Sequence, residues 1–315
     1  MKRTNLVVVR AGGNSLHGRW LELPYAQRHY DLVVSYYDEA AFDAFQSAEG
    51  VTAVLVKGGK WDGLFRTLKE FDLDGYDYVW LPDDDIAIAA TDVNAIFDLC
   101  RENGLALAQP ALSRESYFSH FIFSQCPGFR LRYTNYIEIM APCLSHAVLL
   151  RALPFFRDTM SGFGLDYIWC RWAESGAFRA AILDTVTMHH TRPVGRVLKA
   201  AMAKSGRPAA KAEEQQLRDI FALDRRIVPI VFAGILQNGD PVFGPIATGR
   251  RMCLAWWKDR TAFRDTRKAR DGILKVARRQ LTKPLDMSML HPQSVPGFLP
   301  ESGEGPAGRS GIGPA

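Results

Sequence analysis

Three adjacent carboxylates, Asp83, Asp84 and Asp85, follow an apolar run expected to form a strand over 77–81. Like charges side by side repel one another unless a cation lies close. Mg²⁺ and Mn²⁺ bind a few carboxylate oxygens and share their remaining positions with water and phosphate. Ligands of open α/β sheets bind beyond the carboxyl ends of the strands. The pattern therefore favours a metal–phosphate site over the alternative, a solvated acidic turn or a helix N-cap.

A second candidate is Asp166, which follows Gly162 and Gly164 and is expected in the first turn of a helix over 164–175. Glycine permits a sharp entry into that helix. The helix dipole favours an ionised carboxylate there, which suits a general base that accepts a proton from a hydroxyl. The alternative is a carboxylate that only complements the dipole.

A histidine pair, His189 and His190, ends an expected strand over 180–188. A neutral imidazole at a strand end can bind a metal ion that carboxylates hold from another segment. The sequence leaves open which histidine is the ligand, and a structural role for both is the alternative.

Four further residues lie where substrate contacts are expected. Lys60 and Trp61 begin a helix, where the ammonium can meet a phosphate and the indole can pack on a ring. A surface lysine beside a core tryptophan is the alternative. Gln109 and Glu138 lie near the ends of expected strands, within reach of a sugar hydroxyl. The residues assigned to substrate binding are Lys60, Trp61, Asp84, Gln109, Glu138 and Gly164.

Short β-branched runs alternate with helical patterns over the first 200 residues. The expected strands lie at 5–9, 31–36, 52–56, 77–81, 105–108, 136–140 and 180–188. The expected helices begin at Asp62, Thr91, Ser145 and Gly164, with apolar residues recurring on one face. This alternation predicts an α/β domain over 1–200, with a mostly parallel sheet flanked by helices.

The pattern changes after residue 200. We expect a helical and hairpin extension over 201–290, with Asn238-Gly239 as the hairpin turn, and a disordered tail over 291–315. Residues 258–283 hold ten Lys or Arg and three Asp or Glu, a charge of +7, which leaves −2 for the rest of a chain of net charge +5. We expect this basic helix to contact an anionic membrane or, as the alternative, to clasp the catalytic domain. The nearly neutral body does not indicate nucleic-acid binding.

The cysteines and the hydropathy pattern indicate in which cellular compartment the protein is expected. The five cysteines are dispersed and form no C-x-x-C pair, so we expect free thiols in a reducing environment. The longest apolar run, 227–236, is far shorter than the ~20 residues of a membrane span. A signal peptide is not expected, because the first apolar run ends at Arg10. These features predict a cytoplasmic protein, peripheral to the inner face of the membrane if the basic helix binds there.

Several motifs, in the same order, resemble domain-of-unknown-function family 707, which occurs in plants and bacteria. The resemblance extends over about residues 55–195, and Asp84 stands where plant members tend to have Glu. The motifs are Lys60-Trp61, Tyr76–Asp85, Leu107–Leu112, Ile137–Pro142, Gly162–Asp166 and Asp184–His190.

The chain also resembles glycosyltransferases of the GT-A type. That resemblance implies that Asp83 and Asp85 are the ends of a D-x-D motif, which binds Mn²⁺ or Mg²⁺ together with a nucleotide diphosphate. It further implies that Asp166 is the base of an inverting transfer and that His190 binds the metal.

The expected function is metal-dependent transfer of a sugar from a nucleotide-sugar to a hydroxyl of a glycan or lipid-linked acceptor, in cell-surface glycan synthesis. One alternative is a GT-A-like nucleotidyltransferase, in which Arg10-Ala11-Gly12-Gly13 serves as a thin triphosphate loop. Another alternative is a non-catalytic sugar-binding protein. Fold alone does not choose among these functions.

Overall fold

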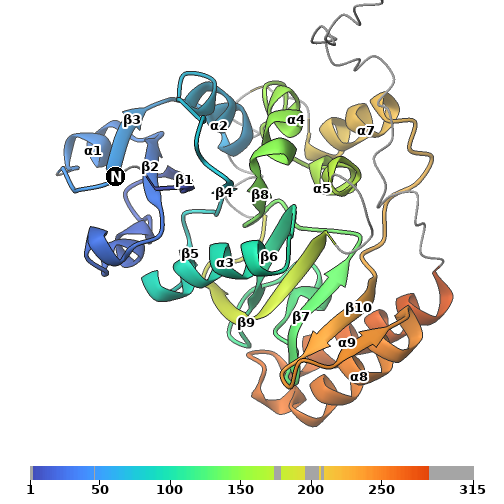
Figure 1. The fold of residues 1–315 in the computed structure, drawn as a ribbon. Coiled ribbons are helices and arrows are strands. Elements are labelled where there is room, and N and C mark those ends of the chain that lie inside the picture. The colour runs from blue at the N-terminus through green and yellow to red at the C-terminus, as the bar shows by residue number, and fades with distance from the viewer. Residues whose placement is uncertain (1–2, 46, 174–178, 196–205, 207–208, 284–315) are drawn as a thin grey trace, which may run out of the picture.

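The computed structural model describes residues 3–45, 47–173, 179–195, 206 and 209–283. Within these residues eleven strands join into one sheet (Figure 1). The strands are β1 (Asn5–Ala11), β2 (Asp31–Tyr36), β3 (Val51–Leu55), β4 (Tyr78–Trp80), β5 (Ile86–Ala87), β6 (Leu107–Leu112), β7 (Phe129–Thr134), β8 (Cys143–Ser145), β9 (Ala180–His190), β10 (Val231–Leu236) and β11 (Pro241–Phe243). Their spatial order is β11-β10-β7-β9-β6-β8-β4-β1-β2-β3, and β5 pairs with β9 off this path.

The direction of the strands decides which of their ends meet. β1 runs parallel to β2 and β4, β2 to β3, and β6 to β9. β8 is antiparallel to both β4 and β6, so those two strands point the same way. The carboxyl ends of β4, β6 and β9 therefore share one edge of the sheet, where ligands of α/β proteins bind. The predicted α/β class is confirmed, and β7, β10 and β11 add antiparallel pairs to it.

Helices cover both faces of this sheet. In the described part of the chain they are α1 (Glu39–Asp43), α2 (Lys60–Leu68), α3 (Ala90–Glu102), α4 (His146–Phe156), α5 (Leu165–Ile168), α7 (Ala210–Ile220), α8 (Pro245–Lys258) and α9 (Thr266–Thr282), and that part also forms five short 3-10 turns. Along β1, Leu6 and Val8 enter one core with α2, α4, α5 and α7. Val7 and Val9 enter the other core with α3, α8 and α9. This alternation is that of a strand buried on both faces.

The strand expected over 136–140 is wrong. The chain leaves β7 at Thr134 and continues as irregular backbone until β8. Side chains bond part of its backbone: Glu138 N donates to Gln109 Oε1, and Trp169 Nε1 donates to Ile137 O. Near its end, the backbone N of Asp83 donates to Met140 O. Apolar alternation here reflects burial of a loop, which periodicity alone does not distinguish from a strand.

One of the predicted helix caps is confirmed and another is wrong. Ser145 caps α4 through a bond from Val148 N, as expected. Thr91 does not cap α3, whose N-cap position is Ala89. The helix expected over 164–175 is one α-turn followed by a 3-10 turn at Trp169–Trp172, and residues 174–178 lie outside the described part.

The region after residue 200 adds to the same sheet. β10 pairs with β7 and turns at Asn238-Gly239 into β11, which confirms the predicted hairpin. The basic segment 258–283 is not one helix: it begins at the end of α8, passes through a 3-10 turn and continues as α9, which Asp265 caps. The division at residue 200 stays a prediction, and the tail expected over 291–315 lies outside the described residues.

All five cysteines are free, as predicted, and four of them are buried. Across the described ranges, no helix combines the length and apolarity needed to cross a membrane.

Candidate active site

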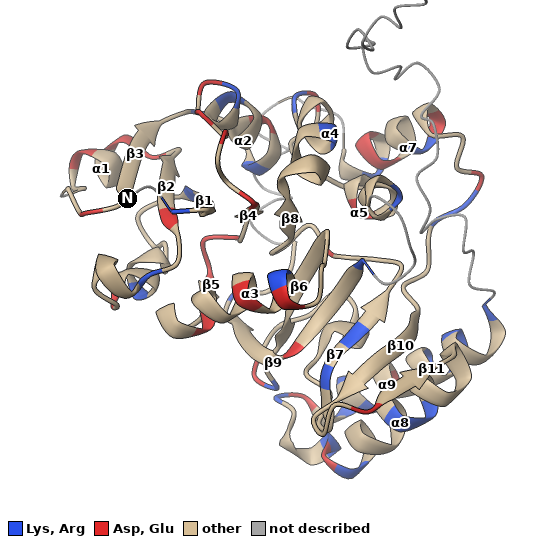
Figure 2. Ribbon diagram, in the orientation of Figure 1, with Lys and Arg blue, Asp and Glu red and all other residues tan. Residues whose placement is uncertain are grey.

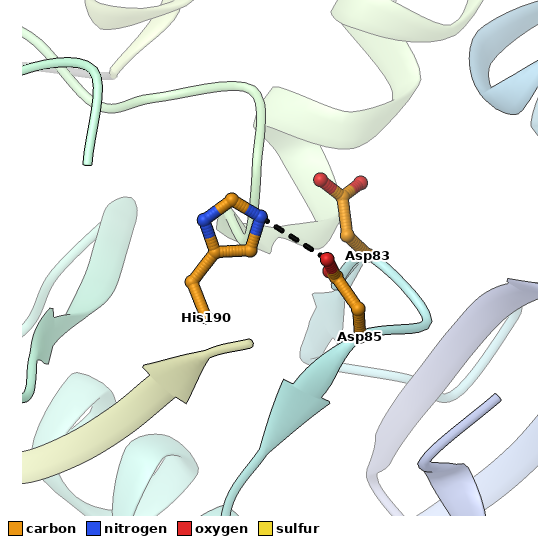
Figure 3. Close-up of side chains that lie close together, drawn as sticks. All are labelled: Asp83, Asp85 and His190. Atoms are coloured by element: carbon orange, nitrogen blue, oxygen red, sulfur yellow. Dashed lines mark ion pairs between the residues drawn. The ribbon is translucent and has the colours of Figure 1, made fainter. Parts of the chain in front are cut away.

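Two strand ends bring together two carboxylates and an imidazole (Figure 3). Asp83 and Asp85 follow β4, and His190 is the last residue of β9. One ligand atom from each of the three lies within 4.8 Å of the others. His189 is not part of this group, since successive side chains of a strand point to opposite faces.

The donor set fits a divalent cation. His190 Nδ1 lies 3.0 Å from the carbonyl oxygen of Tyr117, and Nε2 lies 3.3 Å from Asp85 Oδ2. The other oxygen, Asp85 Oδ1, is buried and has no hydrogen-bond partner among the described residues. Carboxylate oxygens with one imidazole suit Mn²⁺, and carboxylates with water suit Mg²⁺.

The pKa values of Asp85 and His190 depend on the contact between these two residues. Burial raises the pKa of Asp85, but the hydrogen bond and charge of His190 outweigh burial and leave it lowered. Burial likewise lowers the pKa of His190, but Asp85 outweighs it and leaves it raised. The pair thus favours a positive charge beside Asp85, as a proton or as a metal ion.

Lys60 reaches the group from the start of α2. Its Nζ lies 2.5 Å from Asp83 Oδ1, and it donates to the carbonyl oxygens of Ile139 and Met140 at 2.8 and 2.9 Å. Burial lowers the pKa of Lys60, and Asp83 opposes that shift. The lysine is therefore a largely buried cation beside the acidic motif, not the surface lysine of the alternative.

Trp61 follows the core alternative. The side chain is fully buried, and its ring lies 4.5 Å from that of Phe156 and 5.9 Å from that of Trp169. It also shapes the loop before Asp166: Gly162 has a φ of 73°, and a Cβ there would lie 2.1 Å from Trp61 Nε1. A fully buried indole cannot pack on a substrate ring, so its role is structural.

Asp84 is not part of the group of three and has partners of its own. Its carboxylate accepts from Arg192 Nη1 at 2.9 Å, Gly12 N at 3.2 Å and Tyr37 Oη at 3.3 Å. The middle residue of the motif therefore ties the loop after β1 to the segment after β9. Burial raises its pKa in spite of Arg192.

Asp166 occupies the first turn of α5, as predicted, but its electrostatics differ from the prediction. Tyr136 Oη donates to Oδ2 at 2.5 Å, and Oδ1 is buried without a partner among the described residues. Burial raises the pKa of Asp166 to about 7. A four-residue helix adds little dipole, so desolvation prevails over the predicted stabilisation of the ionised form.

Glu138 is a buried acid that bonds Gln109. Its carboxylate accepts from Gln109 Nε2 at 3.2 Å, and its backbone N donates to Gln109 Oε1 at 2.9 Å. Burial raises the pKa of Glu138 to about 8, and the charges of Asp166 and His190 both act on it. Gln109 and Glu138 are thus a mutually bonded buried pair, and Glu138 responds to the charges of both His190 and Asp166.

Helix α7 holds the loop that precedes Asp166, which the sequence analysis missed. The buried carboxylate of Glu213 accepts from Thr159 Oγ1, Met160 N, Ser161 N and Ser161 Oγ at 2.5–3.0 Å. Gly164 has a φ of 100° and lies against Leu217 of the same helix, where a Cβ would come within 3.1 Å. The assigned substrate residue Gly164 therefore packs against α7. No local pattern in the sequence pairs Glu213 with a segment more than 50 positions away.

A family model described as "Protein of unknown function (DUF707)" matches residues 24–127. This match confirms the resemblance, although it begins earlier and ends earlier than the motifs suggested. It covers about a third of the chain, including Lys60, Asp83 and Asp85, and ends before Asp166 and His190. No protein with a curated description matches the chain.

Solved structures with a distantly similar fold include S. aureus TarS and GalNAc-T7. Residues 1–349 of S. aureus TarS in complex with UDP-GlcNAc align with 89% of this chain and 90% of that one, at a TM-score of 0.41 and 11% identity. GalNAc-T7 with UDP, GalNAc and Mn²⁺ aligns over 61% of this chain and 44% of that one, at 0.44 and 8%.

Proposed function

We propose that the protein is a metal-dependent glycosyltransferase, which moves a sugar from a nucleotide-sugar to an acceptor hydroxyl. The observation that carries this proposal is the group of Asp83, Asp85 and His190 at one edge of the sheet. The charges of both His190 and Asp166 act on Glu138, so Asp166 belongs to the same electrostatic environment. A group that can hold a cation, together with a partly protonated carboxylate, suits departure of a diphosphate and removal of a hydroxyl proton.

Asp83, Asp85 and His190 would hold Mn²⁺ or Mg²⁺. When bound, that ion supplies positive charge that stabilises the leaving diphosphate. Lys60 keeps Asp83 oriented through its short ion pair and adds a cation at the same edge. Tyr117 keeps the imidazole of His190 turned toward Asp85 through its carbonyl oxygen.

Asp166 is proposed as the base that accepts the acceptor proton in an inverting transfer. Its Oδ1 is the atom with free acceptor capacity, because Tyr136 occupies Oδ2. A pKa of about 7 leaves much of the carboxylate ionised at neutral pH while keeping it a competent proton acceptor.

The nucleotidyltransferase alternative requires Arg10 to face a triphosphate, but Arg10 is bonded within the protein. Arg10 is 5% exposed, and its guanidinium donates to Ser35 Oγ and to the carbonyl oxygens of Val56, Gly58 and Gly59. It stabilises the loop before α2 instead of facing a triphosphate. No contact among the described residues specifically favours the non-catalytic alternative.

The membrane contact remains part of the proposal, with a surface defined by α8 and α9. Along α8, Ile246, Arg250, Leu254 and Trp257 recur at helical spacing on the exposed side. On the adjoining side of α9 lie Leu274 and Leu281, 60% and 66% exposed, and the guanidinium of Arg270 is 5.9 Å from the Trp257 ring. We name this apolar and basic set the α8–α9 outer face.

The charge on these two helices supports an anionic partner (Figure 2). Exposed apolar side chains interspersed with arginines suit a headgroup layer. We propose that the protein acts in the cytoplasm, at the inner face of the membrane, on a glycan or lipid-linked acceptor of cell-surface glycan synthesis.

A thermal-shift screen tests the proposed function. Nucleoside diphosphates and their sugars are added with and without Mn²⁺, because a ligand that binds only the folded state raises Tm. At least one nucleoside diphosphate should raise Tm more with Mn²⁺ than without it. A panel in which Mn²⁺ makes no difference contradicts the proposal.

A further inference from the structure

A cavity of about 200 Å³ lies between residues 118–122 and helix α9. Helix α9 lines it with Lys268, Lys275 and Arg279 and with the single acid Asp271. The helix comes close to the facing segment at Gly272, where a Cβ would lie 2.5 Å from the Phe121 ring. The cavity is therefore narrow and carries an excess of positive charge.

Two of these cations are not paired with an acid of the described residues. Lys268 is 3.7 Å from Asp265, whereas Lys275 and Arg279 make no ion pair with any carboxylate in the described ranges. Arg279 is half-buried, and burial lowers its pKa. A guanidinium and an ammonium that share one cavity without a counter-ion match an oxyanion such as phosphate.

The cavity adjoins the candidate base. The ring of His120, which lines the cavity, meets the ring of Tyr136 edge-on at 5.4 Å between centroids. Tyr136 in turn donates a hydrogen bond from its hydroxyl to Asp166 Oδ2. His120 therefore contacts both the cavity and the tyrosine that bonds the candidate base.

His120 is neutral in this position. Burial lowers its pKa to about 4, and the charges of Arg279 and Lys275 add to that shift. Its Nδ1 is buried and without a partner among the described residues. The imidazole can therefore donate or accept one hydrogen bond without adding charge.

We propose that this cavity binds a phosphate group of the acceptor and so places the acceptor hydroxyl beside Asp166. This inference rests on the proposed function and deepens it, because it names the acceptor as a phosphate-bearing molecule. Lys275 and Arg279 bind the phosphate, and His120 separates it from Tyr136.

Ring-resonance NMR of His120 tests the proposal without a transfer assay. Inorganic phosphate and glucose 6-phosphate are titrated into the full chain, and a His120→Gln variant assigns the resonance. The wild type should show a saturable shift, and K275Q/R279Q should bind at least tenfold more weakly. The matched control R278Q removes an exposed arginine from the same helix and should bind like the wild type. No saturable shift, or equal weakening in R278Q, overturns the proposal.

Two further measurements distinguish a soluble phosphate from a lipid headgroup, and this inference from the proposed function. Vesicles of phosphatidylglycerol that shift the resonance while both soluble phosphates fail overturn the proposal in favour of a lipid headgroup. Asp85→Ala should leave the phosphate titration unchanged, and K275Q/R279Q should leave Mn²⁺-dependent nucleotide binding unchanged. A failed phosphate titration with intact nucleotide binding thus overturns this inference alone.

Discussion

His190 presents both ring nitrogens to oxygen acceptors: Nδ1 lies 3.0 Å from the Tyr117 carbonyl oxygen, and Nε2 lies 3.3 Å from Asp85 Oδ2. A neutral imidazole carries one proton, so one of these contacts would set a lone pair against an oxygen. Either a second proton or a metal ion relieves that repulsion. The relationship explains why an aspartate after β4 and a histidine at the end of β9 act as one unit.

Asp166→Asn should lower sugar transfer at saturating donor by about 10²–10⁴-fold and leave donor binding intact, because it removes a positioned base but keeps the side-chain size. In the wild type, kcat/KM should rise as pH increases through about 7, since the base acts in its ionised form and its pKa is raised to about 7. The variant should lose this limb of the pH profile. Near-normal turnover, or a product with retained anomeric configuration by NMR, removes Asp166 from this role.

Glu138 should make the fold more stable in mild acid than in mild base. Its raised pKa, about 8, means that its contribution to stability is fully present below the unfolded value of about 4.3 and is lost as pH rises through about 8. Glu138→Gln stays neutral and keeps an oxygen for Gln109. In EDTA, the loss of unfolding free energy between pH 5 and pH 8.5 should shrink by up to about 4 kcal/mol.

Urea unfolding at the two pH values measures this difference. Glu22→Gln, an exposed carboxylate change, is the matched control and should behave like the wild type. If Glu138→Gln and the wild type lose the same free energy between the two pH values, Glu138 is not the buried acid described here.

Glu213→Ala should lower the free energy of unfolding by roughly 2–4 kcal/mol, because it leaves several buried donors of the 159–161 loop without an acceptor. Gln216→Ala changes an exposed side chain of the same helix and should cost less than about 0.5 kcal/mol. Equal denaturation midpoints for the two variants would show that α7 does not hold the loop.

The place of a residue can be predicted from the sequence where a single strand and its end define it. Asp83, Asp85 and His190 each follow or end a strand, so the α/β topology alone brings them to one edge. Contacts between distant segments could not be predicted: Glu213 and Tyr136 reach the Asp166 loop from other parts of the chain. The predicted effect of the helix dipole on Asp166 was wrong, because the dipole follows from position in the sequence, whereas desolvation depends on what packs around the carboxylate.

The α8–α9 outer face should bind anionic membranes. The wild type should sediment with phosphatidylglycerol vesicles at low salt, less at high salt, and not with phosphatidylcholine vesicles. Leu254→Glu/Leu281→Glu should weaken this binding at least about tenfold, because burying each leucine side chain in the membrane would stabilise the bound state by about 1.5 kcal/mol or more. Leu150→Glu, an exposed position on α4, is the control, and equal loss in both variants speaks against this face.

Calorimetry of nucleoside diphosphate binding, with and without Mn²⁺, tests the proposed metal site on the wild type, Asp85→Ala, His190→Gln and His189→Gln. The wild type should bind in a Mn²⁺-dependent way, and Asp85→Ala should abolish this binding while its fold stays intact by circular dichroism. His190→Gln should weaken binding about 10–100-fold, and His189→Gln should match the wild type because it lies outside the group of three. Undiminished Mn²⁺-dependent binding by Asp85→Ala would show that the Asp83, Asp85 and His190 group does not hold the metal.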